Sequence, residues 1–283
     1  MKKLKGLFAL LRFELPFSAG ICVVMGQILA SGEIASLIVT ACGFLSVFFI
    51  SASILVLNDY FDVETDKINA PHRPIPSNAV SRTEALLLSL FLLIAGLILS
   101  YLLNLTALII AVFLLMIGFL YNRFFKKSGL PGNLMGSISV GMTFIYGGVS
   151  VGLPFNKMSW FFGIIAALID LGEEIAADSM DIQGDKLISS KSLAIKYGRR
   201  AAIKVSVLIF ISVIILTTLP FILSWFSVSY LLPVSIMDLF IGYSSYKLFK
   251  SEGTDGRKYI RLLYLGATSG LIVFIIMRLF EIQ

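Results

Sequence analysis

The sequence predicts an all-α, polytopic membrane protein with nine transmembrane helices around a central cavity. Hydrophobic residues make up 58% of its 283 residues and charged residues only 14%, whereas an ordinary soluble protein carries about 25% charged residues. The mean hydropathy is +0.93. The net charge of +6 does not indicate nucleic-acid binding, because the basic residues lie in short loops between long apolar runs.

Nine apolar runs are long enough, or nearly so, to cross about 30 Å of hydrocarbon. In chain order they cover residues 14–31, 35–58, 84–102, 105–122, 134–153, 159–178, 201–223, 228–247 and 260–280. The basic start of the chain resembles a signal peptide, but no A-x-A cleavage site is evident and many spans follow, so we expect a retained first helix. No long linker divides residues 1–283, so we predict a single transmembrane domain.

The distribution of basic residues predicts the orientation of these spans. All but two of the 23 Lys and Arg residues fall in the N-terminus and in alternate loops, and the exceptions are Lys157 and Arg278. Cytoplasmic loops of membrane proteins carry the excess of Lys and Arg. We therefore expect a cell-membrane protein with its N-terminus in the cytoplasm.

Two acidic motifs of the same form, D-x-x-D-x-x-x-D-K, stand at the ends of the second and sixth runs. Their acids are Asp59, Asp62, Asp66, Asp178, Asp181 and Asp185. Positions i, i+3 and i+7 lie on one face of a helix, so each motif points three carboxylates in one direction. Like charges this close repel each other unless cations lie between them. The motifs therefore predict a site for divalent metal and an anionic ligand, facing the cytoplasm.

The ligand types favour Mg²⁺. Asn58 adds an amide oxygen just before Asp59, and carboxylate and amide oxygens are hard ligands that suit Mg²⁺ or Ca²⁺. His72 is the only histidine, and Cys22 and Cys42 lack zinc-site spacing, so a histidine- or cysteine-based metal site is not expected. Mg²⁺ usually takes one or two carboxylates and completes its shell with waters and substrate phosphates.

The second motif extends inward along the sixth predicted helix. A continuous stripe is expected from Asp170, Glu174, Asp178, Asp181 and Asp185. A charge near the centre of a span costs about 2.5–3.5 kcal/mol, so the innermost acid is expected to face a polar cavity. Asp238 lines the same cavity or pairs with a neighbour, and Glu173 is given no role. Because the two motifs lie four helices apart, we predict two four-helix repeats plus a ninth helix.

Basic side chains near the motifs are candidate phosphate contacts. They are Arg12, Lys67, Arg73, Arg123, Lys126, Lys127, Lys186 and Lys191, with Tyr121 and Asn122 as further phosphate or metal partners. Arg grips a phosphate with two parallel N–H bonds, whereas Lys supplies a point charge. Most of these charges could instead only set topology. Arg73 stands out, because the three prolines of residues 69–76 predict a stiff extended loop behind the first motif, ahead of a capping box at Ser81–Glu84.

These residues together resemble the UbiA superfamily of intramembrane prenyltransferases. Asn58-Asp59-x-x-Asp62-x-x-x-Asp66, with Arg73-Pro74-Ile75-Pro76 behind it, is similar to the first signature of that family. Asp178-x-x-Asp181-x-x-x-Asp185 is similar to the second. The resemblance covers nearly the whole chain and implies a nine-helix enzyme with a prenyl tunnel inside the membrane. One departure is Glu173-Glu174, where relatives often have a basic residue.

The resemblance implies a Mg²⁺-dependent transfer from a prenyl diphosphate. It assigns Asn58 and the six motif aspartates to the metal and diphosphate set, and Arg73, Lys126 and Lys191 to phosphate contacts. Within the family, the pattern is most similar to the archaeal enzymes that add a second geranylgeranyl group to geranylgeranylglyceryl phosphate in ether-lipid synthesis. The implied partners are therefore a prenyl diphosphate donor, a lipid glycerophosphate acceptor and membrane lipids, without nucleic acid.

Four alternatives remain open at this point. A relative with an aromatic or chlorophyll-type acceptor would carry a similar R-P-I-P loop. A cation-coupled transporter could use the acidic stripe, although transporters tend to place their site near the midplane. A CDP-alcohol phosphotransferase would carry D-G-x-x-A-R after its first aspartates, which neither motif does. A non-catalytic lipid-binding scaffold would gain nothing from desolvating six aspartates.

Overall fold

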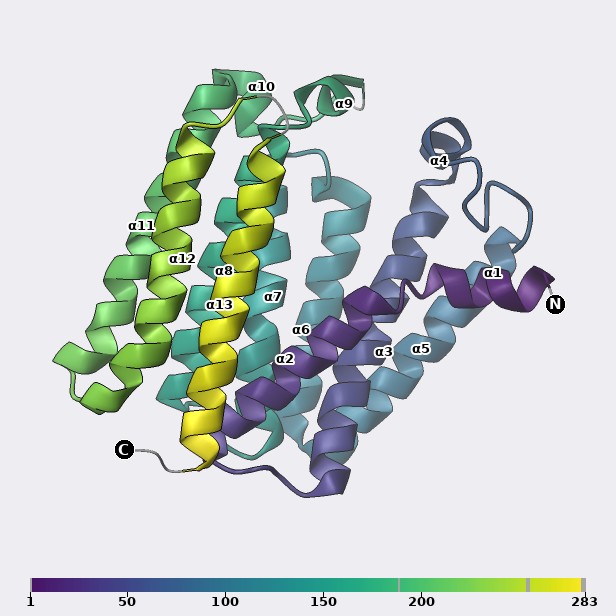
Figure 1. The fold of residues 1–283 in the computed structure, drawn as a ribbon. Helices are drawn as coiled ribbons and strands as arrows, with labels where there is room; N and C mark the ends of the chain where they lie inside the picture. Colours follow the sequence, from purple (N-terminus) through teal and green to yellow (C-terminus); the bar gives the residue numbers. More distant parts are fainter. Residues whose placement is uncertain (1, 188, 253–254, 281–283) are drawn as a thin grey trace. The chain divides into compact units, whose positions relative to one another are not determined.

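A computed structural model describes residues 2–187, 189–252 and 255–280, and every regular element in this part of the chain is helical (Figure 1). The chain divides into two compact units. Unit 1 consists of Met1–Phe124 and Met142–Trp160, and unit 2 of Phe125–Gly141 and Phe161–Gln283. The division falls within α7 (Leu130–Ser150) and α8 (Lys157–Asp178).

The remaining helices belong to one unit each. Unit 1 holds α1 (Lys2–Leu10), α2 (Glu14–Ser31), α3 (Leu37–Phe61), α4 (Val63–Asn69), α5 (Arg82–Leu103), α6 (Leu105–Leu120) and all but the last residue of a π-helical turn, Tyr121–Phe125. Unit 2 holds α9 (Ile182–Leu187), α10 (Leu193–Tyr197), α11 (Arg199–Ile222), a 3-10 turn (Val228–Tyr230), α12 (Leu231–Phe249) and α13 (Gly256–Leu279).

Each predicted apolar run coincides with a helix to within a few residues. In the described part of the chain, seven helices are long and apolar enough to cross a membrane, which agrees with a multi-pass membrane protein. The two runs outside that set are α7, rich in glycine and serine, and α8, which carries four acidic residues between Asp170 and Asp178. That nine helices cross the membrane, in two repeats, stays a prediction.

The start of the chain forms two helices where the sequence predicted one. Between α1 and α2, Arg12 adopts a left-handed backbone with φ of 45°. Pro16 lies in the first turn of α2, and a proline ring collides with the carbonyl four residues earlier in a continuous helix. The chain therefore breaks at Arg12, and α1 packs instead beside the start of α5, where Lys3 forms an ion pair with Glu84.

α5 has one face of large apolar side chains and an opposite face of mainly small residues, as is common in membrane helices. Its large exposed side chains include Leu87, Phe91, Ile94, Ile98 and Tyr101. Their spacing of four and three residues puts them on one stripe, which is suited to lipid. The buried face is lined mainly by small residues such as Gly96 and Ser100, as is usual where helices pack inside membranes.

The core of each unit is packed separately. In unit 1, a buried cluster includes Val23, Ile145 and Tyr146, and the Tyr146 hydroxyl lies 2.8 Å from Ser46 Oγ and 2.9 Å from Ser100 Oγ. A Cβ added at Gly147 would lie 2.3 Å from the Val23 carbonyl oxygen, so this glycine lets α7 approach α2, as small residues do where membrane helices pack closely. In unit 2, the largest cluster joins α8, α11, α12 and α13.

The proline segment behind the first motif is a series of turns, so the prediction of an extended loop is wrong. Arg73 N donates to Ala70 O at 2.9 Å, and Ser77 N donates to Arg73 O at 3.0 Å. Prolines exclude a helix here, but proline also suits the early positions of tight turns. The segment ends at the predicted capping box, where Glu84 N bonds to Ser81 Oγ and Ser81 N to Glu84 Oε2.

Candidate active site

The first acidic motif spans a break between two helices, and not one continuous helix as predicted. Asp59 lies in the last turn of α3, Asp62 stands at the bend with φ −87° and ψ 3°, and Asp66 lies on α4. Backbone bonds continue through the bend, from Asp62 N to Asn58 O at 3.0 Å and from Asp66 N to Asp62 O at 2.8 Å. The bend changes the helix direction while keeping the three acids in one compact segment.

Two arginines converge on this motif. Asp59 and Asp66 are buried, with 3% and 6% of their surface exposed. Arg73 Nη1 lies 2.6 Å from Asp66 Oδ2 and 3.5 Å from Asp59 Oδ1. Arg12 forms an ion pair with the same Asp59 oxygen. Buried carboxylates need such partners, so the structure brings two candidate phosphate contacts, Arg12 and Arg73, to two acids of the first motif.

Asn58 is held in place by the π-helical turn that follows α6. Its amide nitrogen donates to Asn122 Oδ1 at 3.0 Å, and Asn122 Nδ2 donates to the Ile54 carbonyl at 2.9 Å. Asn122 is 8% exposed, and Tyr121 beside it is half-buried. A π-helical turn is rare and is frequently found at functional sites, and here it places Asn122 against the first motif.

Lys67 lies apart from the buried acids of its own motif. Its Nζ atom is 3.0 Å from Glu64 Oε2, and both side chains are exposed on α4. Glu64 also lies 4.0 Å from Arg82 Nη1. Lys67 therefore takes part in a surface ion-pair group, and its role as a phosphate contact stays a prediction.

The second motif also crosses a helix end, so the predicted acidic stripe is not one helix. α8 ends at Asp178, and Ser179 N shares its bond between Ile175 O and Ala176 O. Ser179 Oγ donates to Ala176 O at 2.6 Å, and such competing bonds tighten and terminate a helix. Asp181 is exposed just before α9. Asp185 belongs to α9, and its side chain lies outside the described residues.

Asp178 is oriented by the first turn of α7, where Asn133 Nδ2 donates to Asp178 Oδ2 at 3.0 Å. The segment just before α7 is also tied down, because Lys191 N donates to Lys127 O at 2.9 Å. Gly129 has φ of 73°, and a Cβ there would lie 2.1 Å from the Lys191 carbonyl oxygen, so only glycine fits. The half-buried Lys126 and the exposed Lys191 therefore stand on two joined segments.

Asp170 has polar neighbours, and its predicted place in a polar cavity stays a prediction. Ser137 Oγ donates to Asp170 Oδ2 at 3.0 Å, and the Tyr264 hydroxyl lies 3.3 Å from Asp170 Oδ1. The same hydroxyl is 3.4 Å from Glu173 Oε2, so Glu173, which received no role from the sequence, belongs to this group. Asp238 accepts from Thr217 Oγ1 at 2.8 Å, which agrees with the pairing alternative.

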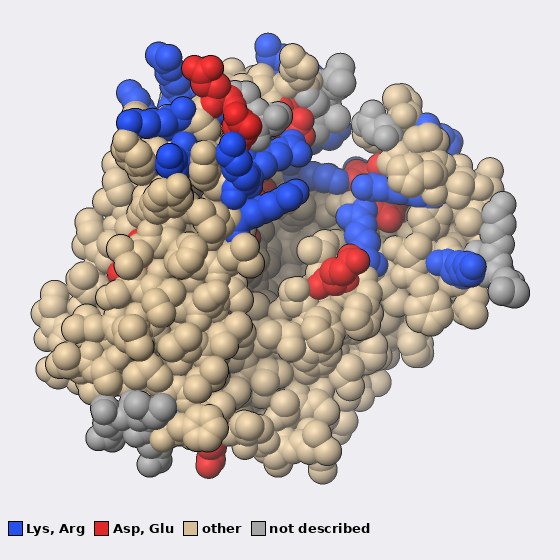
Figure 2. All heavy atoms as spheres, in the orientation of Figure 1, with Lys and Arg blue, Asp and Glu red and all other residues tan. Residues whose placement is uncertain are grey.

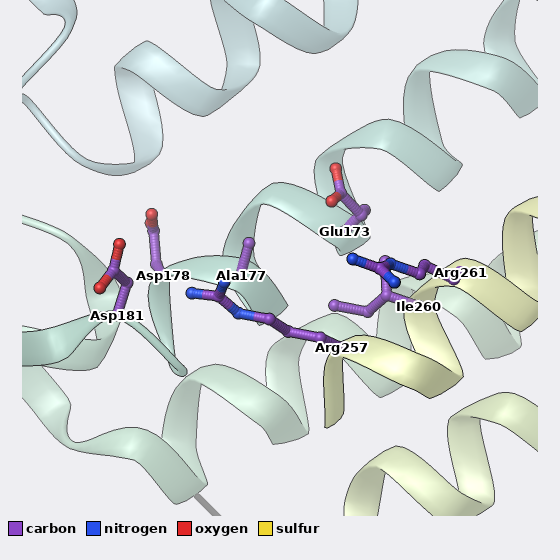
Figure 3. A pocket seen from close by; sticks show the side chains of 7 residues that line it. All are labelled: Glu173, Ala177, Asp178, Asp181, Arg257, Ile260 and Arg261. Carbon is purple, nitrogen blue, oxygen red and sulfur yellow. The ribbon is translucent and has the colours of Figure 1, made fainter. Parts of the chain in front are cut away.

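A pocket of about 320 Å³ opens beside the second motif within unit 2 (Figure 3). It is lined by Glu173, Ala177, Asp178, Asp181, Arg257, Ile260 and Arg261. The acids come from α8 and the turn after it, and the two arginines from α13. Sequence reasoning treated Arg257 and Arg261 as topology charges. Their spacing of four residues, with Tyr264 three residues further on, is the signal that could have placed them on one helix face.

The charged side chains of each unit gather where the acidic motifs lie. Figure 2 shows Lys and Arg crowding the end of unit 2 where Figure 1 draws α9 and α10, while the visible surface of its long helices is mostly uncharged. In unit 1 the charges gather around α4 and α1. This agrees, unit by unit, with the one-sided distribution of basic residues in the sequence.

The donor atoms fit a hard divalent cation. The residues assigned to metal offer only carboxylate and amide oxygens, which suit Mg²⁺. Within the described residues, no three Asp, Glu, His or Cys side chains form a ready-made metal cluster. A Mg²⁺ site does not require one, because this ion takes part of its shell from waters and substrate phosphates.

Comparisons with known proteins identify relatives along nearly the whole chain. A model of the UbiA prenyltransferase family matches residues 19–266. Digeranylgeranylglyceryl phosphate synthase from Methanocaldococcus jannaschii is 34% identical over 278 residues, covering 98% of this chain and 97% of that protein. The synthase of the same name from Saccharolobus solfataricus is 32% identical over 282 residues, covering 96% of each.

Comparison with solved structures finds proteins of the same kinds. A structure of digeranylgeranylglyceryl phosphate synthase matches with a TM-score of 0.86 and 33% identity, covering 99% of both chains. A UbiA homolog from Archaeoglobus fulgidus bound to DMAPP and Mg²⁺ matches with a TM-score of 0.73 and 18% identity, covering 96% of this chain and 99% of that one. At that identity the second match shows a shared fold.

Proposed function

Because this chain belongs to the UbiA prenyltransferase family, we propose that it moves a geranylgeranyl group from geranylgeranyl diphosphate to geranylgeranylglyceryl phosphate. The product is a precursor of archaeal-type ether lipids. The observation that carries this proposal is the similarity, along nearly the full length of both chains, to proteins named digeranylgeranylglyceryl phosphate synthase. The two acidic motifs that such a reaction needs are both present.

The metal and diphosphate set consists of acids from both motifs. We assign it to Asn58, Asp59, Asp62, Asp66, Asp178, Asp181 and Asp185. When bound, Mg²⁺ supplies positive charge that stabilises the departing diphosphate. The choice of Mg²⁺ rests on the oxygen donors of this set, and the homolog with bound Mg²⁺ and DMAPP is in keeping with a divalent metal.

The arginines of unit 1 are the protein's own contribution to leaving-group stabilisation. Arg12 and Arg73 are held at Asp59 and Asp66, so their N–H donors are already positioned beside the acids that would share the diphosphate. Preorganised donors of this kind stabilise developing negative charge without reorganisation. Lys126, Lys191, Lys67 and Tyr121 are proposed as further contacts to the substrates.

The proposed reaction exchanges one C–O bond for another. The bond between the allylic carbon of the donor and its diphosphate breaks, and the electron pair leaves with the diphosphate. The free hydroxyl oxygen of the acceptor forms an ether bond to that carbon and loses its proton. We further propose that the N-terminus and the active site face the cytoplasm, because the basic residues lie on that side in the predicted topology.

The experiment that tests this function is product analysis with purified protein. Geranylgeranyl diphosphate is offered with geranylgeranylglyceryl phosphate, with an aromatic acceptor or with a chlorophyll-type alcohol, and products are identified by mass spectrometry. The expected result is a Mg²⁺-dependent product only with the glycerophosphate lipid. A product with the aromatic or chlorophyll-type acceptor instead would keep the family and overturn the acceptor.

A further inference from the structure

The pocket of unit 2 has two arginines on one wall that the diphosphate assignment does not use. Arg257 and Arg261 line it from α13, opposite Glu173, Ala177 and Asp178 of α8. In Figure 3 the Arg257 side chain reaches toward Ala177 and Asp178, and the Arg261 guanidinium lies near Glu173. Both arginines are exposed overall, so a ligand can reach them.

The direction of these arginines is fixed by the helix that carries them. Tyr264 lies on the same face of α13, and its hydroxyl is 3.3 Å from Asp170 and 3.4 Å from Glu173 on α8. Residues spaced by four and three positions share a helix face, so the contact of Tyr264 also turns Arg257 and Arg261 toward α8. A basic residue that only sets the membrane topology would not need to face a particular helix.

Lys258 shows what an ordinary topology charge looks like in the same helical turn. Its Nζ atom lies 3.6 Å from Asp255 Oδ1, and both side chains are exposed. It is absent from the lining of the pocket. The positive-inside rule does not distinguish Lys258 from the two arginines. Only the arginines line the pocket, so basic residues within one turn of α13 differ in their surroundings.

The α13 wall of the pocket has the chemistry of a phosphate headgroup site, whereas Glu173, Asp178 and Asp181 make the opposite wall acidic. Two guanidinium groups offer paired N–H donors, which match the oxygens of a phosphate. Ile260 and Ala177 add an apolar surface between the charged groups. A volume of about 320 Å³ is at the lower end for ligand sites, so it suits a glycerol phosphate headgroup and leaves the lipid chains outside.

We propose that Arg257 and Arg261 bind the phosphate of the lipid acceptor. This inference rests on the proposed function, since it assigns the acceptor end of that same reaction. The donor diphosphate is assigned to the metal held by the acids and to Arg12 and Arg73, whereas the phosphate monoester of the acceptor is assigned to Arg257 and Arg261 of α13. A headgroup anchored there places its short glycerol backbone beside Asp178 and Asp181, on the wall where the transfer is proposed.

The test distinguishes an effect on donor binding from an effect on acceptor binding. Within the acceptor, it distinguishes recognition of the phosphate from recognition of the rest of the lipid. The variants are Arg257→Gln and Arg261→Gln, with Lys258→Gln as the matched charge-loss control and Arg257→Lys to keep the charge but lose the paired donors. KM is measured for the donor and for two acceptors, geranylgeranylglyceryl phosphate and the dephosphorylated geranylgeranylglycerol. Binding of the radiolabelled phosphate acceptor is measured separately, without donor.

The expected result is a rise of about tenfold or more in the acceptor KM and Kd for each Arg→Gln variant, because a charge-assisted bond is worth ~1.5–3 kcal/mol. The donor KM and the use of geranylgeranylglycerol stay unchanged, Arg257→Lys falls between, and Lys258→Gln behaves as wild type. Equal losses with both acceptors, a raised donor KM or unchanged acceptor binding would overturn the inference.

If wild type transfers to neither acceptor, the proposed function fails, and the binding measurement still decides whether this pocket holds the phosphate lipid.

Discussion

Arg73 Nη1 lies 2.6 Å from Asp66 Oδ2, so a residue assigned to phosphate is paired with a residue assigned to metal. Asp66 is only 6% exposed, and the ion pair with Arg73 supplies the opposite charge that a buried carboxylate needs. If Arg73 contacts the diphosphate as proposed, binding would exchange its carboxylate partner for a phosphate. Arg73 would then act both on the stability of the motif and on the affinity for the donor.

Replacing Arg73 by Ala is expected to weaken donor binding. Loss of the guanidinium removes charge-assisted bonds worth about 1.5–3 kcal/mol, so the donor KM should rise roughly 10- to 100-fold. Steady-state kinetics with varied geranylgeranyl diphosphate measure this. Arg82→Ala, which removes an exposed cation near the same motif, is the control, and an unchanged donor KM in Arg73→Ala would reduce Arg73 to a topology charge.

Asn133→Ala is expected to change the metal requirement more than the fold. Asn133 Nδ2 holds Asp178 Oδ2 at 3.0 Å, and losing a group that orients a metal ligand typically costs 10- to 100-fold in metal affinity. The Mg²⁺ concentration for half-maximal activity should therefore rise about tenfold or more, at nearly unchanged Tm. A Mg²⁺ titration identical to wild type would show that Asn133 does not position Asp178 for metal.

Asn122→Ala is expected to lower stability as well as activity. The substitution removes the hydrogen bonds of Asn122 to the Ile54 carbonyl and the Asn58 amide, and each lost hydrogen bond costs about 0.5–1.5 kcal/mol. Thermal unfolding in detergent should show a lower Tm, and donor turnover should fall because Asn58 loses its support. Normal Tm and turnover together would contradict the role given to the π-helical turn.

Gly129→Ala is expected to destabilise unit 2 locally. The residue has φ of 73°, and its new Cβ would lie 2.1 Å from the Lys191 carbonyl oxygen. Backbone strain of this kind costs on the order of 1–3 kcal/mol, and the collision adds to it. Gly136→Ala is the control, because nothing lies within 4 Å of its Cβ position. Equal Tm values for the two variants would contradict the joined-segment geometry.

The family, the helical fold and the position of most helices could be predicted from the sequence. Apolar runs locate membrane helices strongly, and the run at 14–31 coincides with α2 residue for residue. The family assignment from the two acidic motifs is confirmed by the matching family model and by relatives above 30% identity. Residue spacing was enough to assign the family because each acidic motif has a fixed pattern within a short stretch of sequence.

The helix breaks could not be predicted with the same rules. A period of i, i+3 and i+7 is compatible with one helix, and it carries no information on the bend at Asp62 or the end of α8 at Asp178. Those ends depend on bonds such as Ser179 Oγ to Ala176 O. Arg257, Arg261 and Glu173 were missed because their role follows from the packing of α13 on α8, which is tertiary.

The central proposal is that Mg²⁺-dependent transfer requires the acids of both motifs. Its most direct measurement is Mg²⁺-dependent transfer from geranylgeranyl diphosphate in Asp62→Ala and Asp181→Ala, with Glu64→Ala, an exposed acid of α4, as the control. Each aspartate variant alone should lose ~10³-fold or more in turnover, comparable to losing several kcal/mol of leaving-group stabilisation, while Glu64→Ala stays active. Undiminished turnover in either aspartate variant would contradict the claim.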